Sequence, residues 1–200
     1  MADELRELIL EHLTLVVIAM AVAIALAVPA GIVATRRPGW RRVVLGFANV
    51  MQTVPSLALF GFLIPIPIIG GIGKRTAIIA LVLYALLPIL RNTLAGILGV
   101  DAAVRESAVA MGRTSRQVLW QVEIPLTART ILAGIRIATV TTIGAATIAA
   151  AIGGGGLGVF IFRGIASVDT RQILAGAIPS ALIALTADAA LGWVERRVAV

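Results

Sequence analysis

The run LTLVVIAMAVAIALAVPAGIVAT at residues 13–35 decides the fold class, because it is long enough to cross a bilayer and carries no charge. An α-helix needs about 20 mostly apolar residues to span the hydrocarbon core. The whole chain agrees with this run: 60% of its 200 residues are hydrophobic and 14% are charged, which also excludes a disordered chain. We therefore predict an all-α, polytopic membrane protein that forms a single domain over residues 1–200.

Four further apolar runs bring the expected number of transmembrane helices to five. The run after residue 43 is interrupted by Pro55, Pro65 and Pro67, so we expect its outer part to bend away. The expected spans are 13–34, 44–64, 76–100, most of 137–162, and 172–194.

Arginine placement predicts the orientation, since short cytoplasmic loops are enriched in Lys and Arg. The loop after the first span holds four arginines in eight residues without an acid, namely Arg36, Arg37, Arg41 and Arg42. We accordingly place the N-terminus outside and the C-terminus in the cytoplasm. The acidic start MADELRELILEH is not typical of a signal peptide, so we expect none.

The composition argues against most kinds of catalytic and ligand-binding site. The chain has no cysteine and a single histidine, His12, which we place at the outer boundary without a role. We predict no catalytic group and no metal site. The net charge of +7 suits lipid headgroups better than nucleic acid, because aromatic residues make up only 4% of the chain. The sequence GKRT at 73–76 lacks key residues of a Walker A loop, so we expect no ATP site here.

The sequence DAAVRESAVAMGRTSRQVLWQVEIP at residues 101–125 is the one extended polar stretch. Its spacing predicts a short helix that ends at Gly112, where a left-handed backbone costs little. Thr114 or Ser115 is suited to cap a second short helix, which we expect Pro125 to stop or redirect. The residues alone leave two interpretations open: a surface that a partner grips, and an unpartnered amphipathic segment on the membrane.

Parts of this stretch resemble a known motif. Glu106-Ser107-Ala108, Gly112, and Val122-Glu123-Ile124-Pro125 have the order and spacing of the EAA motif of ABC importer permeases, with mild departures at Ser107, Val122 and Ile124. Four other stretches are similar to one branch of that family, the permeases for glycine betaine, carnitine and choline. They are QTVPSLALFGFLIP (52–65), YALLPILRNTLAGI (84–97), IGGGGLG (152–158) and AGAIPSALIAL (175–185).

The resemblance implies a type I ABC importer permease fold in a bacterial or archaeal plasma membrane. It implies a transport subunit that catalyses no covalent chemistry and moves a quaternary ammonium osmolyte by alternating access. Its implied partners are ATPase subunits that bind ATP and Mg, an extracytoplasmic substrate-binding protein, and a second copy or a sister permease. It makes 101–125 the cytoplasmic coupling segment, and the candidates for contact with the ATPase are Glu106, Ala108, Gly112, Arg113 and Pro125.

Polar residues in the second span are the candidates for a translocation path, because each is costly in lipid. Four of them fall at i, i+3, i+4 and i+7, on one face of a helix: Asn49, Gln52, Thr53 and Ser56. Tyr84 offers an aromatic face to a quaternary ammonium. Hydrogen bonding between helices is the competing interpretation of the polar face, and packing is the competing one for Tyr84.

The glycine run has two interpretations as well. We expect it to provide a bend and tight helix packing, with Gly154 and Gly158 forming a GxxxG pair, and a gate hinge is the alternative. Its members are Gly153, Gly154, Gly155, Gly156 and Gly158. Near the inner end of the third span, Arg91 either extends to the membrane surface or pairs with Asp188.

Three other functions compete with osmolyte import. One is a permease of the same fold for another solute, such as methionine or a metal complex. The second is a self-contained channel or secondary transporter, although such transporters commonly show internal repeats and intramembrane carboxylates, and here only Asp188 qualifies. The third is a membrane scaffold without transport, which the polar face of the second span disfavours.

Overall fold

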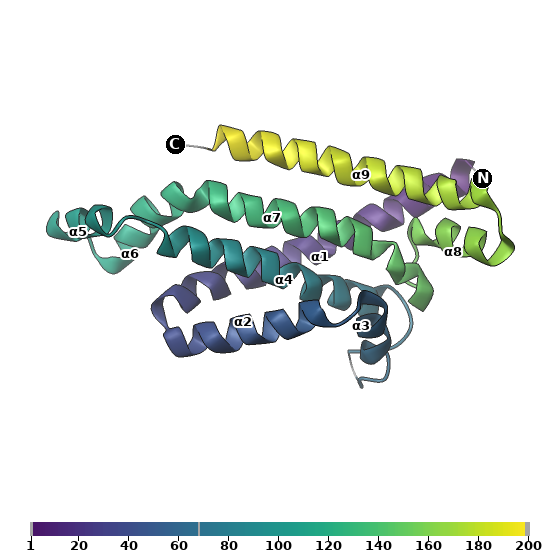
Figure 1. The fold of residues 1–200 in the computed structure, drawn as a ribbon, viewed down its shortest axis with the longest axis horizontal. Coiled ribbons are helices and arrows are strands. Elements are labelled where there is room, and N and C mark those ends of the chain that lie inside the picture. The colour runs from purple at the N-terminus through teal and green to yellow at the C-terminus, as the bar shows by residue number, and fades with distance from the viewer. Residues whose placement is uncertain (1, 68, 199–200) are drawn as a thin grey trace.

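The computed structural model describes residues 2–67 and 69–198, which form an elongated bundle of helices (Figure 1). In chain order the elements are α1 (Ala2–Arg36), α2 (Pro38–Thr53), α3 (Ser56–Leu63), α4 (Lys74–Leu98), α5 (Ala102–Ala110), α6 (Ser115–Val118), the π-helical turn η1 (Leu119–Glu123), α7 (Ile124–Ala146), the 3₁₀ turn η2 (Ile148–Ile152), α8 (Gly158–Ser167) and α9 (Thr170–Arg197). No strand occurs in the part of the chain that the structure describes, so the all-α prediction is confirmed.

Four continuous helices are long and apolar enough to cross a bilayer, and α2 with α3 supplies a broken fifth span. The long helices are α1, α4, the stretch from Ser115 to Ala146, and α9. The predicted third and fifth spans agree closely with α4 and α9. The first span is longer than predicted, because α1 also includes the acidic N-terminal residues.

Helix α4 is the centre of the bundle and packs against α1, α2 and α7. Small residues allow this close packing. A Cβ placed on Gly31 of α1 would lie 2.8 Å from Thr93, and one on Gly134 of α7 would lie 2.5 Å from Asn92, both on α4. The backbones of α1 and α7 therefore approach α4 more closely than larger side chains would allow.

The two ends of the bundle carry different sets of connections (Figure 1). At one end lie the α1–α2 turn, the segment α5–α6 and the C-terminus, held together by ion pairs such as Arg36–Glu123 and Arg129–Glu195. At the opposite end lie the start of α1, α3 and α8. The segments that the arginine count assigns to the cytoplasm thus share one end.

The predicted second span, residues 44–64 as one helix with a bent outer part, is wrong in where it bends. Helix α2 ends at Thr53, and α3 leaves at 106° to it. The cause is local: Pro55 disfavours helical backbone at Val54, whose ψ of 128° is extended. The bend therefore lies at the first proline of this run and not near Pro65.

The predicted fourth span, most of 137–162, is also wrong in its boundaries. Helix α7 begins at Ile124 and ends at Ala146, and residues 148–156 form a 3₁₀ turn and a glycine-rich turn. The prediction placed Arg129 and Arg136 where the fourth span enters the membrane, whereas Arg136 lies in the middle of α7 and is paired with Asp188. An ion pair within the protein makes an arginine tolerable at this depth.

Labelling of single cysteines tests the orientation. Because the α1–α2 turn and α6 share one end, Gly39→Cys and Arg116→Cys should both resist an impermeant thiol reagent added outside intact cells. Val168→Cys at the start of the α8–α9 turn should react, since Val168 is 89% exposed at the opposite end. Labelling of Gly39→Cys from outside would contradict an external N-terminus.

Candidate functional site

The segment from 101 to 123 forms two short helices joined by a tight turn, as predicted. The Asp101 carboxylate caps α5 by accepting a hydrogen bond from the backbone N–H of Ala103 at 2.8 Å. Helix α5 ends before Gly112, which has a φ of +80°. A side chain there would meet no neighbour within 4 Å, so the requirement for glycine comes from the backbone conformation alone.

Helix α6 begins with a capping box. The Thr114 hydroxyl accepts from the N–H of Gln117, and the Gln117 side chain accepts from the N–H of Thr114 at 2.8 Å. The prediction that Thr114 or Ser115 caps this helix is confirmed, with Thr114 in that position.

The prediction that Pro125 stops or redirects the second helix is wrong. The chain passes without a break from α6 through η1 into α7, with Pro125 near the start of α7. A proline has no N–H to donate and its ring crowds the carbonyl four residues earlier, and the wider π-helical turn just before it relieves both problems. The segment 101–123 is therefore connected to α7 by continuous helical backbone.

A hollow of about 430 Å³ lies between α5 and η1. Ala108 is buried at its base, while Glu106 on the same helix is exposed. Arg113 crosses one end and donates to the Gln121 side chain at 3.0 Å. Met111 also lines this hollow and is 69% exposed. This end thus presents an apolar hollow with charges around it, a surface suited to a protein partner.

Sequence reasoning missed the residue that anchors this segment, Glu123. Its side chain is completely buried, yet it is ionisable. Arg36 at the end of α1 donates to one carboxylate oxygen, and the Arg105 Nε of α5 lies 3.0 Å from the other. The second contact is an ion pair without the angle of a hydrogen bond, so the oxygen and the Nε lack a directed partner. One carboxylate therefore joins α1, α5 and η1.

The expected face of polar residues in the second span does not form as one helical face, because the α2–α3 break separates Ser56 from the other three. Asn49 accepts from Arg91 at 2.6 Å, and the Thr53 hydroxyl bonds back to the carbonyl of Val50. Gln52 and Ser56 are half-buried and make no side-chain hydrogen bond in the residues that the structure describes.

Tyr84 has a structural contact that the sequence did not indicate. Its hydroxyl, on α4, donates to the backbone carbonyl of Val54. This carbonyl lies at the break between α2 and α3, so the bond ties the break to the central helix. The role of Tyr84 toward a solute stays a prediction.

The glycine run is a turn, so the prediction of a GxxxG helix pair is wrong. Gly153, Gly155 and Gly156 have positive φ values, which a regular helix excludes. The turn is tightly packed all the same: a Cβ on Gly158 would lie 1.7 Å from the carbonyl oxygen of Thr147. A role as a gate hinge stays a prediction.

The turn also packs on the start of α1. The N–H of Gly156 donates to the Glu11 carboxylate at 3.1 Å, and Lys74 donates to the same carboxylate at 2.7 Å. His12, beneath the turn, is fully buried in the bundle, and its expected place at the outer boundary stays a prediction.

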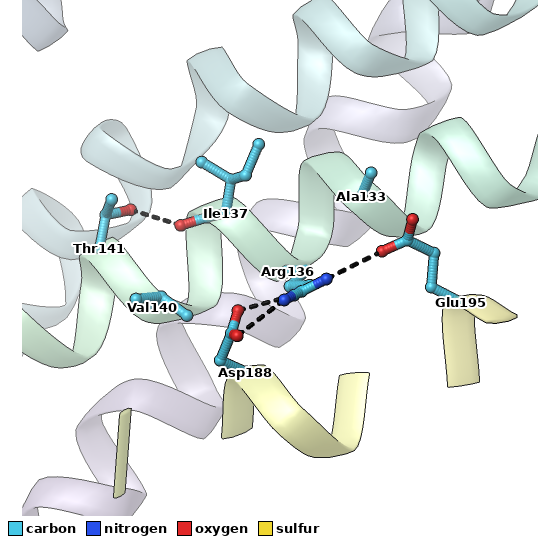
Figure 2. A pocket seen from close by; sticks show the side chains of 7 residues that line it. All are labelled: Ala133, Arg136, Ile137, Val140, Thr141, Asp188 and Glu195. Carbon is cyan, nitrogen blue, oxygen red and sulfur yellow. Dashed lines mark hydrogen bonds and ion pairs between the residues drawn. The ribbon is translucent and has the colours of Figure 1, made fainter. Parts of the chain in front are cut away.

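Charged residues join α7 to α9 within the spans (Figure 2). Arg136 donates to both oxygens of Asp188, at 2.6 and 2.7 Å, and to Glu195 at 3.4 Å. Asp188 therefore pairs with Arg136, while Arg91 bonds to Asn49. Over residues 2–67 and 69–198, no group of three potential metal ligands is found.

The sequence matches, over residues 27–200, the family described as the binding-protein-dependent transport system inner membrane component. This chain belongs to that family. It is thus a permease, a membrane-embedded transport subunit and not an enzyme.

Three relatives are similar to this permease over nearly their full lengths. A carnitine transport permease protein (OpuCB) of Listeria monocytogenes is 48% identical and covers 94% of this chain and 84% of its own. A choline transport system permease protein (OpuBB) of Bacillus subtilis is 43% identical, with 94% and 85% covered. An osmoprotectant import permease protein (OsmW) of Salmonella typhimurium is 41% identical, with 100% and 92% covered.

Solved structures share the fold of this permease. An inward-facing structure of the MetNI methionine ABC transporter has a TM-score of 0.88 at 21% identity, covering 99% of this chain and 97% of the other. An amino acid ABC transporter has a TM-score of 0.80 at 18% identity, covering 98% and 94%. The predicted type I ABC importer permease fold is confirmed.

A conservative change tests the anchoring role of Glu123. Glu123→Gln keeps the size of the side chain but leaves two arginines without their shared counter-charge. Breaking a buried ion pair costs about 3–5 kcal/mol, and we expect the lower value because Arg36 is half exposed. The melting temperature of the purified permease should fall by about 5–10 °C.

Glu106→Gln, the same change at an exposed position of α5, is the matched control and should shift stability by less than about 0.5 kcal/mol. Equal melting temperatures for the two variants would show that Glu123 does not hold the segment in place.

Proposed function

We propose that this permease forms the membrane pathway of an ATP-driven importer for quaternary ammonium osmolytes such as glycine betaine, carnitine or choline. The similarity to the three relatives carries the proposal, because it extends over at least 94% of this chain in each case. The proposed reaction is transport by alternating access, without covalent chemistry in this subunit.

The α5–α6 end is the proposed contact with the ATPase subunits, which bind ATP and Mg. Its hollow offers apolar area for this contact, and the exposed Glu106 offers a charge. The proposed contact residues are Glu106, Ala108, Gly112, Arg113 and Pro125. Gly112 sets the turn, and Pro125 lies where the segment enters α7. Because Glu123 joins this segment to α1 and η1, movement of the ATPase would reach the spans directly.

The opposite end is the proposed contact with an extracytoplasmic substrate-binding protein, and the N-terminus lies on that side. A second copy of this chain or a sister permease completes the pathway. Asn49, Gln52, Thr53, Ser56 and Tyr84 stay the proposed path residues. Gln52 and Ser56 are the strongest of these, since neither side chain makes a hydrogen bond within the described residues.

Reconstituted uptake tests the proposed function. Liposomes that contain this permease, with its ATPase and binding protein, should take up radiolabelled glycine betaine, carnitine or choline only when ATP is supplied on the ATPase side. A matched preparation with a hydrolysis-deficient ATPase is the control and should show no uptake.

Uptake of methionine in place of these osmolytes would replace the proposed substrate but keep the importer mechanism. Solute movement by the permease alone, without ATP or partners, would overturn the importer mechanism in favour of a channel or secondary transporter.

Two substitutions test the coupling contact. Gly112→Val forces a β-branched residue into a φ of +80°, and Glu106→Lys reverses an exposed charge. Loss of a charged contact at an interface costs about 2–5 kcal/mol, so docking should weaken at least tenfold. Co-purification of the ATPase and substrate-stimulated ATP hydrolysis are the measurements.

Two matched variants control for general damage. Gly46→Val changes a helical glycine whose Cβ would meet nothing within 4 Å, and Glu7→Lys reverses a charge at the opposite end of the bundle. Both should keep the ATPase bound. Normal coupling in Gly112→Val and Glu106→Lys would mean that 101–125 is a passive surface segment.

A further inference from the structure

Charged side chains form a ladder between α7 and α9 that the proposed path does not use. Arg129 and Arg136 lie seven residues apart on α7, and Asp188 and Glu195 lie seven apart on α9. Seven residues are close to two helical turns, so each pair occupies one face of its helix. Arg129 lies 3.6 Å from Glu195, and Arg136 bonds to both carboxylates, so the four charges alternate in sign and sum to zero.

The chain makes room for Arg136. A Cβ on Gly192, one turn after Asp188, would lie 3.0 Å from the guanidinium carbon of Arg136. The absence of a side chain at Gly192 allows the guanidinium to lie flat on α9 between Asp188 and Glu195. The ladder therefore depends on a specific small residue as well as on four charges.

The Arg136–Asp188 pair of the ladder lies at a depth where charges are costly. Asp188 is nine residues before the end of α9, which places it about 14 Å from that end. Ionisable side chains within spans face a protein interior or a water-filled cavity, because hydrocarbon does not solvate them. Within this chain the side chains of Arg136 and Asp188 stay 33% and 40% exposed. In the assembled transporter this face must therefore meet protein or water and not lipid.

A hollow of about 390 Å³ opens directly beside the ladder. Figure 2 shows Arg136, Asp188 and Glu195 on one side of it, and Ala133, Ile137 and Val140 of α7 along the rest. The hollow combines one guanidinium and two carboxylates with an apolar wall. This is the combination that complements a small molecule with a methylated cation at one end and a carboxylate at the other.

We propose that the α7–α9 ladder is a transit site for zwitterionic cargo, in which Arg136 binds the carboxylate of the solute while Asp188 and Glu195 face its quaternary ammonium group. This inference rests on the proposed function and specifies which of the candidate osmolytes the pathway favours. An entering zwitterion exchanges partners with the Arg136–Asp188 pair, so every charge keeps a counter-ion and no net charge is added.

A cation without a carboxylate fits this site poorly. Choline occupies the carboxylates but leaves Arg136 without a counter-ion in a partly desolvated site, which is costly. Glycine betaine and carnitine carry both charges and avoid this cost. The site discriminates by charge balance, so it needs no cage of aromatic rings.

Weak binding of the solute is an advantage at the ladder. A pathway has to bind a solute well enough to admit it and weakly enough to release it. The internal ion pair competes with the solute for the same charges and keeps its affinity low. The ladder also lies nearer the arginine-rich end than the α2–α3 break does, since the break is about 22 Å from the start of α2.

Opposite changes in preference test the proposal. In reconstituted liposomes, Arg136→Gln should lower the ratio of glycine betaine uptake to choline uptake at least tenfold, because the site loses its carboxylate partner and gains a net negative charge. Asp188→Asn should raise the same ratio, because the cation loses a counter-ion. A purely structural pair would change both uptakes together and leave the ratio within twofold.

Arg42→Gln is the matched control, since it removes the same charge from an exposed position of α2 that belongs neither to the ladder nor to the residues that line the hollow. Its uptake ratio should stay within twofold of the parent. A shift equal to that of Arg136→Gln would show that net charge acts at a distance, and would overturn direct contact at Arg136.

A cysteine in the hollow provides a second measurement that does not depend on the stability of the charge variants. The chain has no native cysteine, so Val140→Cys is the only thiol of this subunit. Glycine betaine should slow its reaction with a small thiol reagent at least threefold, and choline should not. Equal protection by both solutes, or by neither, would overturn the transit site.

The two measurements also separate this inference from the proposed function. A parent that takes up neither solute would refute osmolyte import. The proposal of a transit site at the ladder would then be tested by the protection of Val140→Cys alone. A parent that imports glycine betaine while Arg136→Gln keeps the parental ratio would refute the ladder alone.

Discussion

The burial of one carboxylate, Glu123, is the interaction on which the end of the bundle that carries α5 and α6 depends. An ionised group without access to water is tolerable only when nearby charges compensate for its desolvation. Here the compensation comes from Arg36 and Arg105, which lie on two different helices. The end of α1 and the whole of α5 are therefore placed by the electrostatic requirement of a third element, η1.

This arrangement makes the surface segment of α5 and α6 part of the membrane bundle. Helix α6 runs through η1 into α7, so one continuous backbone connects the surface segment to a span. The carboxylate adds a cross-connection to α1, and α1 and α7 both pack closely on α4. A force applied to α5 or α6 thus reaches three spans through covalent structure, an ion pair and close packing of small residues.

Local signals in the sequence predicted those parts of the structure that local physics determines. The uncharged runs identified α4 and α9, and the pattern around Gly112 and Thr114 gave the turn and the cap of α6. The wrong predictions concern residues whose position depends on partners that are distant in the sequence. Arg136 lies inside α7 because Asp188, 52 residues later, neutralises it, and Glu123 is buried because Arg36, 87 residues earlier, reaches it. Neither pairing has a local pattern that a sequence displays.

The contact between Glu11 and the glycine-rich turn has a consequence for biogenesis. Helix α1 leaves the ribosome before the rest of this bundle, yet its Glu11 carboxylate accepts a hydrogen bond from the N–H of Gly156, 145 residues later. His12 likewise is covered by a turn made from the last quarter of the chain. Until that turn is synthesised and folded, the start of α1 leaves Glu11 without one of its hydrogen-bond donors and His12 without the backbone that covers it. A chain interrupted before residue 153 would therefore leave Glu11 without the backbone donor that it has in the complete bundle.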